Sequence, residues 1–339
     1  MSIVHFLNVL EGDCNIIQHD SDRITVIDVS NASNEIETLS ERAVRTSAQR
    51  QKMLLRTQVP TGKSDYRQKL QPDNPIEYLK NHIKTDSFFR FIITHPDMDH
   101  LDGIKDLFES FNIACFWDTD NNKEIDNFNG GGYNKDDWDF YLKLRDGEYR
   151  ADVRRAFNSG NSWNFFQQDN IHILSPTPEL IEQANDCEDY NDSSYVLLYT
   201  PPKTNGQNWK LLFAGDSHDK TWQHILENHK ELVSNVDILF APHHGRDSER
   251  SYDFLSTVNP TITLFGNASA EHLAYDCYPE IRITNNQAGY VIMDINETRI
   301  ALYVKHQEFA NDFRNNPKRQ WGNAGYNSIL KAYELGQIT

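Results

Sequence analysis

The sequence has few cysteines, and they lie far apart. Its four cysteines, Cys14, Cys115, Cys187 and Cys277, form no CxxC pair. Cysteine-rich metal sites and the disulfide frameworks of small secreted proteins both use closely spaced cysteines. The spacing therefore argues against both, and we expect reduced, mostly structural thiols, as in a cytoplasmic protein.

Long apolar stretches are also missing. The chain has no cationic start followed by an apolar segment, and no run approaches the roughly 20 residues that a helix needs to cross a bilayer. The apolar fraction of 38% is low, but 339 residues suffice for a substantial core. We therefore expect a protein with no membrane partner, whose normal core carries polar insertions.

Positive charge is scarce, because 33 Lys and Arg face 50 Asp and Glu and give a net charge of -17. Such a chain repels nucleic acid at long range, so a polyanionic substrate would need a local basic surface. Residues 42–69 are the exception, since their only acidic residue is Asp65. A solvated helix face or loop would show the same pattern. The residues that we predict to bind a phosphodiester or nucleic acid are Arg42, Arg45, Arg50, Lys52 and Arg56.

Short apolar runs that end in polar residues recur along the chain and predict strands. Helical patterns at residues 101–108 and 221–228 indicate a mixed α/β protein. Residues 290–295 and 299–304 predict a hairpin near the C-terminus. The other predicted strands are residues 3–10, 23–29, 88–94, 171–174, 195–200, 209–215, 236–241 and 261–265.

Two stretches, residues 34–74 and residues 118–168, lack this pattern of apolar runs and helical segments. They are predicted to be insertions in a single domain of residues 1–339. Long loops serve as lids or binding surfaces, or only decorate a surface. The second stretch contains Trp138, Tyr141 and Trp163. These aromatic side chains could stack on bases or form a small core of the insertion itself.

Four potential metal ligands lie within six residues, directly after the apolar run of residues 91–93. They are His95, Asp97, Asp99 and His100. A tight loop after a strand lets such closely spaced side chains converge, and imidazole with carboxylate suits Zn²⁺ or Mn²⁺. A chance surface cluster is the alternative, but an apolar strand is an unusual carrier for one.

Two further predicted strands end in the same manner. Asp216 follows residues 211–215, and His243 and His244 follow residues 238–242. An isolated Asp after a strand is usually a helix N-cap. Three strand ends with ligand-type side chains favour a metal site instead.

This series of motifs resembles that of the metallo-β-lactamase superfamily and is most similar to the hydrolase domain of ComEC-type competence proteins. The resemblance covers most of the chain outside the two insertions. It implies an αββα sandwich with a metal site at one edge of the two sheets, holding one or two Zn or Mn ions. The motifs that carry the resemblance are the HxDxDH of residues 95–100, Gly215-Asp216, His243-His244-Gly245, the opening strand with Gly12-Asp13, the Asn-x-x-Ser-x-Val-Leu of residues 191–197, and Arg282-x-Thr284.

The resemblance also implies a role for each ligand. His95 and Asp97 would bind one metal, and Asp216 would bridge to the second, which Asp99, His100 and His244 would complete. His243 would either replace His244 as the ligand or face the substrate as a proton donor or oxyanion partner. The residues predicted to be catalytic are Asp216, Asp97 and His243.

The sequence departs from the common superfamily pattern in two places. Asp97 stands where HxHxDH has its middle histidine, which shifts the preference toward Mn²⁺. The usual separate histidine before the Gly-Asp motif has no clear counterpart. His172 lies in the right interval but inside a predicted strand, so we interpret it as structural. One metal site is therefore expected to be weak.

Two-metal hydrolases activate a water near neutral pH and stabilise the attacking and leaving oxygens of a phosphoryl group. This chemistry, the basic stretch and the ComEC resemblance favour a phosphodiesterase or nuclease. Hydrolysis of a lactone or thioester, or of a small phosphoester of the phosphorylcholine type, is the alternative. A binding module with a relict site is a third reading, against which the nearly complete ligand series argues.

Overall fold

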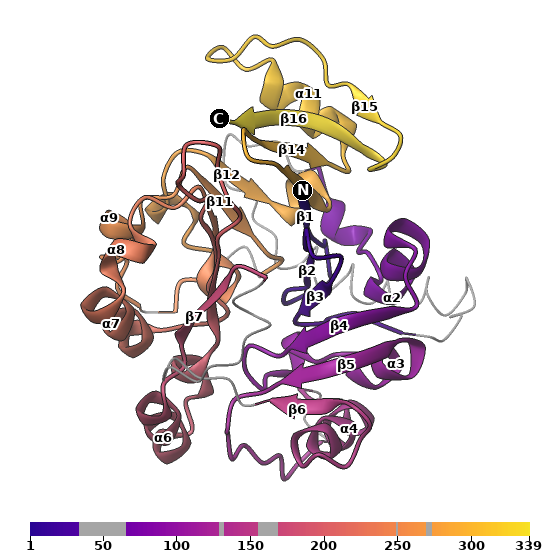
Figure 1. Ribbon diagram of the computed structural model, residues 1–339, viewed down its shortest axis with the longest axis vertical. Helices are drawn as coiled ribbons and strands as arrows, with labels where there is room; N and C mark the ends of the chain where they lie inside the picture. Colours follow the sequence, from indigo (N-terminus) through magenta and orange to yellow (C-terminus); the bar gives the residue numbers. More distant parts are fainter. Residues whose placement is uncertain (34–65, 129–131, 155–168, 249, 269–272) are drawn as a thin grey trace.

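The computed structural model describes residues 1–33, 66–128, 132–154, 169–248, 250–268 and 273–339, and within them two β-sheets lie face to face (Figure 1). The larger sheet has the order β15-β16-β14-β13-β1-β2-β3-β4-β5-β6, and the smaller has the order β12-β11-β10-β9-β8-β7. The strands of the larger sheet are β1 Ser2–Phe6, β2 Asn15–Gln18, β3 Ile24–Ile27, β4 Ser87–Ile92, β5 Asn112–Trp117, β6 Asp152–Arg154, β13 Val291–Ile295, β14 Ile300–Val304, β15 Tyr326–Asn327 and β16 Ala332–Ile338. Those of the smaller are β7 Ile171–Ser175, β8 Val196–Tyr199, β9 Leu211–Phe213, β10 Ile238–Phe240, β11 Ile262–Phe265 and β12 Arg282–Thr284.

The main hydrophobic core fills the space between the sheets. Successive side chains of a strand point to opposite faces, so in β4 Ile92 joins this core while Phe91 packs under the outer helices. The rings of Phe6 in β1 and Phe240 in β10 meet across the core with centroids 5.4 Å apart. Apolar burial thus holds the two sheets together.

Helices cover the outer face of each sheet (Figure 1). Those against the larger sheet are α2 Pro75–Tyr78, α3 Ile104–Ser110 and α4 Lys135–Arg145. Those against the smaller sheet are α7 Asp219–Asn228, α8 Lys230–Val233 and α9 Leu255–Val258. The remaining α-helices of the described residues are α6 Pro178–Cys187, α10 Asn285–Ala288 and α11 Gln307–Arg314. The order helix, sheet, sheet, helix confirms the predicted αββα sandwich.

Part of each predicted insertion packs into the sandwich. In the second, the Asn134 side chain accepts hydrogen bonds from the backbone N–H groups of Asp136 and Asp137 and so begins α4. Trp138 and Tyr141 of this helix are buried in the cluster on the larger sheet, rather than in a separate core. In the first, the Asn8 amide donates to the backbone carbonyl of Gln68. Residues 34–65 and Trp163 lie outside the described residues.

The predicted hairpin is confirmed, because β13 and β14 pair antiparallel with Ile295 opposite Ile300. Strands β2, β5, β6, β12, β15 and β16 were not predicted. The four residues of β2 lie between β1 and β3, which supply its hydrogen bonds. Among the described residues, no helix combines the length and apolar character of a membrane span.

Candidate metal centre

The candidate site lies where parallel strands of the two sheets end. Strands β3, β4 and β5 run parallel in the larger sheet, and β9, β10 and β11 run parallel in the smaller. The loop after β4 carries His95 and His100, the loop after β9 carries Asp216, and the loop after β10 carries His243 and His244. The structure brings these side chains together from both sheets.

Two buried histidines from one loop face the Asp216 carboxylate. His95 and His100 are 0% exposed, and their ring centroids lie 4.2 Å apart. The distance from His95 Nε2 to Asp216 Oδ2 is 3.7 Å, and that from His100 Nε2 to Asp216 Oδ1 is 3.3 Å. The short 3₁₀ helix Met98–His100 closes the loop and returns the second imidazole toward the first.

Each of the two oxygens of the Asp216 carboxylate faces a different pair of imidazoles. The Nε2 atom of His243 lies 3.6 Å from Oδ2, on the side of His95. The Nε2 atom of His244 lies 3.6 Å from Oδ1, on the side of His100. Burial disfavours the charged carboxylate, but the surrounding imidazoles, with His244 and His100 foremost, hold the pKa of Asp216 well below its usual range.

The turn that carries His243 and His244 has an unusual backbone. Both residues have left-handed conformations, with φ of 52° and 54°, and Gly245 follows with φ of 81°. Left-handed residues other than glycine are uncommon and cluster at functional sites. A Cβ atom on Gly245 would lie 2.2 Å from the Phe265 ring, so a larger residue does not fit there.

Asp97 and Asp99 stand farther out, with side chains 34% and 32% exposed. Asp97 Oδ2 lies 3.7 Å from His95 Nε2, and Asp99 Oδ2 lies 3.4 Å from His244 Nε2. Burial opposes their ionisation, but the nearby His95 imidazole lowers the pKa of Asp97, and His100 and His244 lower that of Asp99. Both therefore remain carboxylates at neutral pH.

Each of the four imidazoles has a partner at Nδ1. His95 Nδ1 lies 3.1 Å from the Thr94 hydroxyl, and His243 Nδ1 lies 2.8 Å from the Ser248 hydroxyl. Carboxylates lie beside the other two: His100 Nδ1 lies 2.8 Å from Asp28 Oδ2, and His244 Nδ1 lies 3.2 Å from Asp13 Oδ1, an ion-pair distance without hydrogen-bond geometry. Such partners at Nδ1 orient imidazoles whose Nε2 atoms bind metals.

The Nε2 atoms themselves fit a cation. Those of His95, His100 and His244 are buried and lack a hydrogen-bond partner, as does Asp216 Oδ1. Two triads have ligand atoms within 4.8 Å of one another: His95, His100 and Asp216, and Asp99, His100 and His244. Buried polar atoms without a partner are costly, and a divalent cation would satisfy them.

The carboxylates of the cluster favour protonation of two of its imidazoles. Burial opposes a proton on His244, but Asp216 and Asp13 raise its pKa to about 10. Carboxylates also raise the pKa of His100. Binding of a cation by these atoms would release protons, because a metal ligand must be a neutral imidazole.

The histidine of β7 does not join the cluster. His172 lies in β7, and its Nε2 pairs with the Thr200 hydroxyl at 2.9 Å, which fits the structural interpretation. Asp28 and Asp13 were not predicted as site residues. The position of Asp28 directly after β3 repeats the pattern of the other strand ends and could have indicated it. The five basic residues predicted to bind substrate, from Arg42 to Arg56, lie outside the described residues.

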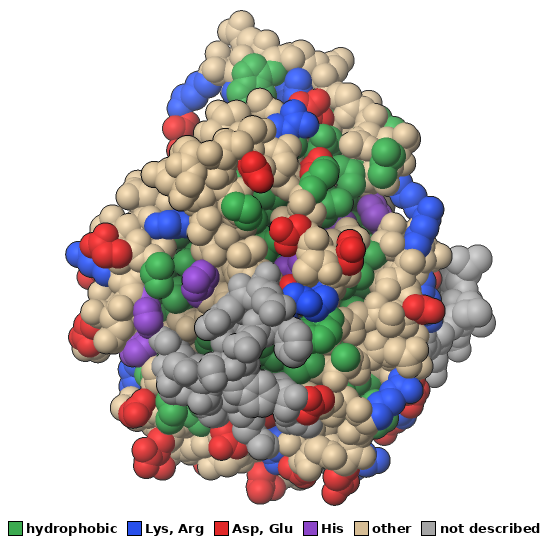
Figure 2. All heavy atoms as spheres, in the orientation of Figure 1, with side chains coloured by type: hydrophobic (Ala, Val, Ile, Leu, Met, Phe, Trp, Pro, Cys, Tyr) green, Lys and Arg blue, Asp and Glu red, His purple; other side chains and the backbone are tan. Residues whose placement is uncertain are grey.

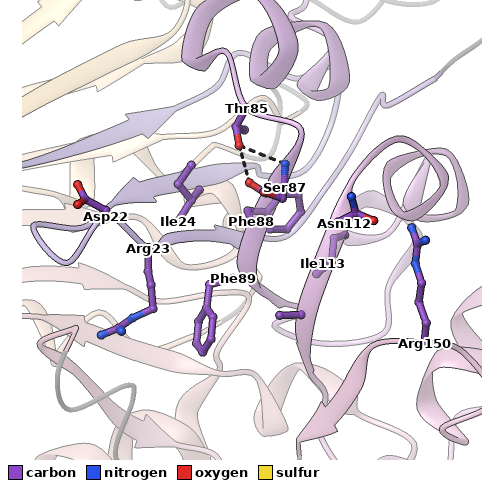
Figure 3. A pocket seen from close by; sticks show the side chains of 11 residues that line it. Asp22, Arg23, Ile24, Thr85, Ser87, Phe88, Phe89, Asn112, Ile113 and Arg150 are labelled. Carbon is purple, nitrogen blue, oxygen red and sulfur yellow. Dashed lines mark hydrogen bonds between the residues drawn. The ribbon is translucent and has the colours of Figure 1, made fainter.

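A hollow of about 540 Å³ lies at the opposite ends of β3, β4 and β5 (Figure 3). Arg23 and Arg150 stand on its two sides. Arg23 pairs with Asp169 at 2.7 Å, and Arg150 donates to the backbone carbonyl of Phe108. Both guanidinium groups thus already have partners in the fold, and we assign no function to this hollow.

Comparisons with known proteins find a distant likeness of fold. No family model matches the chain, and neither does any curated protein. A solved structure of the metallo-β-lactamase fold protein YhfI from Bacillus subtilis has 10% identity and a TM-score of 0.39, over 84% of this chain and 96% of that one. Igni18, a metallo hydrolase from the archaeon Ignicoccus hospitalis, has 10% identity and a TM-score of 0.42, over 87% of this chain and 100% of that one. A diphosphatase from the PhnP family has 9% identity and a TM-score of 0.38, over 84% and 94%.

Proposed function

We propose that the chain is a metal-dependent hydrolase that cleaves phosphodiesters, either as a nuclease or as a phosphodiesterase of the ComEC-like type. The observation that carries the proposal is the set of buried, unpartnered Nε2 atoms of His95, His100 and His244 around Asp216. A structural histidine cluster would pair these atoms with fixed donors or acceptors. Here these atoms face one another and nearby carboxylates, which supports a cation site.

One or two Zn²⁺ or Mn²⁺ ions, when bound, would supply an activated water and stabilise negative charge on a phosphoryl group. Asp99, His100 and His244 would hold one ion, and we call them the second set. His95 and Asp97 would hold the other and form the first set. Asp216 would serve both sets, because its two oxygens face different imidazoles.

His243 fits a ligand or proton acceptor better than a proton donor. Burial lowers its pKa to about 3, so the imidazole is neutral at pH 7. The Ser248 hydroxyl fixes Nδ1, while Nε2 lies beside Asp216 Oδ2 on the side of the first set. His243 therefore offers the first set the imidazole that the absent separate histidine would have supplied.

The class of substrate, nucleic acid or small phosphodiester, is also a proposal. Trp138 and Tyr141 are buried, so neither supports base stacking. On the face drawn in Figure 2, the coloured Lys and Arg side chains are interspersed with Asp and Glu and form no continuous basic surface. Our case for nucleic acid depends on the basic residues between Arg42 and Arg56. A small phosphodiester needs no such surface.

Replacement of Asp216 by Asn tests the proposed function. The amide cannot supply the negative charge that two cations share, so we expect turnover of bis-p-nitrophenyl phosphate with Mn²⁺ or Zn²⁺ to fall by roughly a hundred-fold or more. Circular dichroism should show an intact fold. Unchanged turnover would reject the proposal, since Asn replaces Asp well as a mere N-cap. Turnover of a simple lactone but of no diester would favour the lactonase alternative.

Salt-dependent binding separates the nuclease from the small-diester enzyme. Replacement of Arg42, Arg45, Arg50, Lys52 and Arg56 by Gln should weaken binding of single-stranded DNA and flatten its salt dependence, because fewer counterions are released. Turnover of the small diester should hardly change. Fluorescence anisotropy at several salt concentrations measures both effects. If the parent protein binds no DNA, the small phosphoester is favoured.

A further inference from the structure

Asp97 is held from outside the histidine cluster by a lysine that belongs to none of the motifs. Lys123 lies beyond β5, and its Nζ forms an ion pair with Asp97 Oδ1. The Tyr133 hydroxyl lies 3.3 Å from the same oxygen and 3.3 Å from the Pro96 backbone carbonyl, and its one proton is shared between these two acceptors. The side chain of Lys123 is only 15% exposed. One oxygen of Asp97 thus already has the Lys123 ammonium and the Tyr133 hydroxyl beside it.

Lys123 is itself fixed by its surroundings. Its backbone N–H donates to the Asn121 side chain at 3.2 Å, and its carbonyl accepts from Arg145 Nη1 at 3.3 Å. Its ammonium lies 5.3 Å from the ring centroid of Tyr133 and 5.1 Å from that of Tyr190. Aromatic faces at these distances attract a cation. The ammonium is therefore a supported neighbour of Asp97 rather than the end of a loose surface chain.

The other oxygen of Asp97 faces the buried histidine. Oδ2 lies 3.7 Å from His95 Nε2, which has no hydrogen-bond partner. The ammonium and the imidazole thus meet different oxygens of one carboxylate. A cation between His95 Nε2 and Asp97 Oδ2 would not have to displace Lys123. Carboxylates that bind metals commonly have such partners on their second oxygen.

We propose that Lys123 is a positioning residue for the first metal-binding set. Together with Tyr133 it engages Oδ1 of Asp97 and leaves Oδ2 directed at His95. This inference rests on the proposed metal-dependent function. The histidines of the second set lie beside Oδ1 of Asp216 and not beside Asp97. The metal affinity of the second set therefore serves as an internal reference.

Titration of the full chain with Mn²⁺ by calorimetry, with elemental analysis, tests the proposal. The binding event that disappears in His95→Ala identifies the first set, and the event that disappears in Asp99→Ala identifies the second. Lys123→Gln should weaken the first event by about 10- to 100-fold, the usual effect of removing such a partner. The second event should not change. Lys123→Arg, which keeps a cationic donor, should recover most of the affinity.

Lys135→Gln is the matched control, because Lys135 pairs with Asp139 at 2.6 Å on the exposed surface of α4. It should leave both events unchanged. The proposal is overturned if Lys123→Gln binds Mn²⁺ more tightly, which would make Lys123 a competitor of the cation. It is also overturned if the first event is unchanged or if both events weaken equally. Absence of any Mn²⁺ or Zn²⁺ binding by the parent protein would refute the proposed function and this inference together, whereas an unaltered first event in Lys123→Gln would refute the inference alone.

Discussion

Asp28 lies behind the candidate metal centre and fixes two of its neighbours. Its Oδ2 lies 2.8 Å from His100 Nδ1 and accepts from the Thr94 hydroxyl at 2.8 Å, while Oδ1 accepts from the Thr94 backbone N–H at 2.7 Å. A carboxylate on Nδ1 keeps the proton there and directs the lone pair of Nε2 toward the site. Asp28 therefore governs the orientation of His100 without facing Asp216.

Replacement of Asp28 by Asn should lower metal affinity by about 10- to 100-fold while the chain stays folded. Asp28 has a φ of 58°, and Asn tolerates this left-handed conformation as well as Asp does. Elemental analysis and Mn²⁺ titration measure the loss. Asp22→Asn is the control, because Asp22 is exposed and also left-handed, with φ of 64°. Equal metal affinity in the two variants would contradict the role of Asp28.

The turn between β1 and β2 packs against the loop that carries several of the candidate metal ligands. Gly12 has a φ of 85°, and a Cβ atom placed on it would lie 1.8 Å from the backbone oxygen of Asp99. The turn therefore packs directly on the loop of residues 95–100. The Gly-Asp turn thus places both a close packing contact and Asp13, the partner of His244, beside the candidate site.

We expect Gly12→Ala to lower the free energy of unfolding by about 2 kcal/mol more than Gly147→Ala does, because overpacking costs about 1 to 3 kcal/mol. Gly147 is a suitable control, since it has a φ of 73° but no atom within 4 Å of the added Cβ. Both variants pay for a left-handed alanine, so their difference isolates the close contact. Urea unfolding monitored by circular dichroism measures it. Equal losses would argue against tight packing of this turn.

Buried histidines make the stability of the whole molecule depend on pH. Burial lowers the pKa values of His5, His19 and His82 to about 4. Their pKa in the unfolded chain is about 6.5. The unfolded state therefore binds protons first as the pH falls. The stabilisation that these three histidines contribute above pH 6.5 is lost between about pH 6.5 and pH 4.

His5 is the clearest test, since it is 1% exposed and pairs with the Tyr78 hydroxyl and with Gln18, each at 2.9 Å. The parent protein should lose about 2 kcal/mol more unfolding free energy than His5→Gln between pH 7 and pH 5, because Gln cannot bind the proton. Urea unfolding at both pH values, with EDTA to exclude metal binding, measures the difference. Parallel losses in the two proteins would show that His5 does not carry this dependence.

The amino-acid sequence by itself determined the features that depend on neighbours along the chain. Apolar runs bounded by polar residues predicted β4, β9 and β10, and each is followed by ligand-type side chains. The hairpin β13–β14 follows from two runs joined by a short turn. The order of the motifs, through the resemblance to the metallo-β-lactamase superfamily, also indicated the four layers. Periodicity and strand ends are local properties, so they can be read without coordinates.

Only the tertiary structure decided how these pieces meet. It placed β2 between β1 and β3 and β5 between β4 and β6, buried Trp138 and Tyr141 against the larger sheet, and gave each oxygen of Asp216 its own two imidazoles. The partners behind the site, Asp28 and Lys123, lie 72 and 26 positions away from His100 and Asp97 along the chain. Hydrogen bonds and ion pairs act over a few ångströms in space whatever the separation in sequence, so no local pattern could assign these residues to the site.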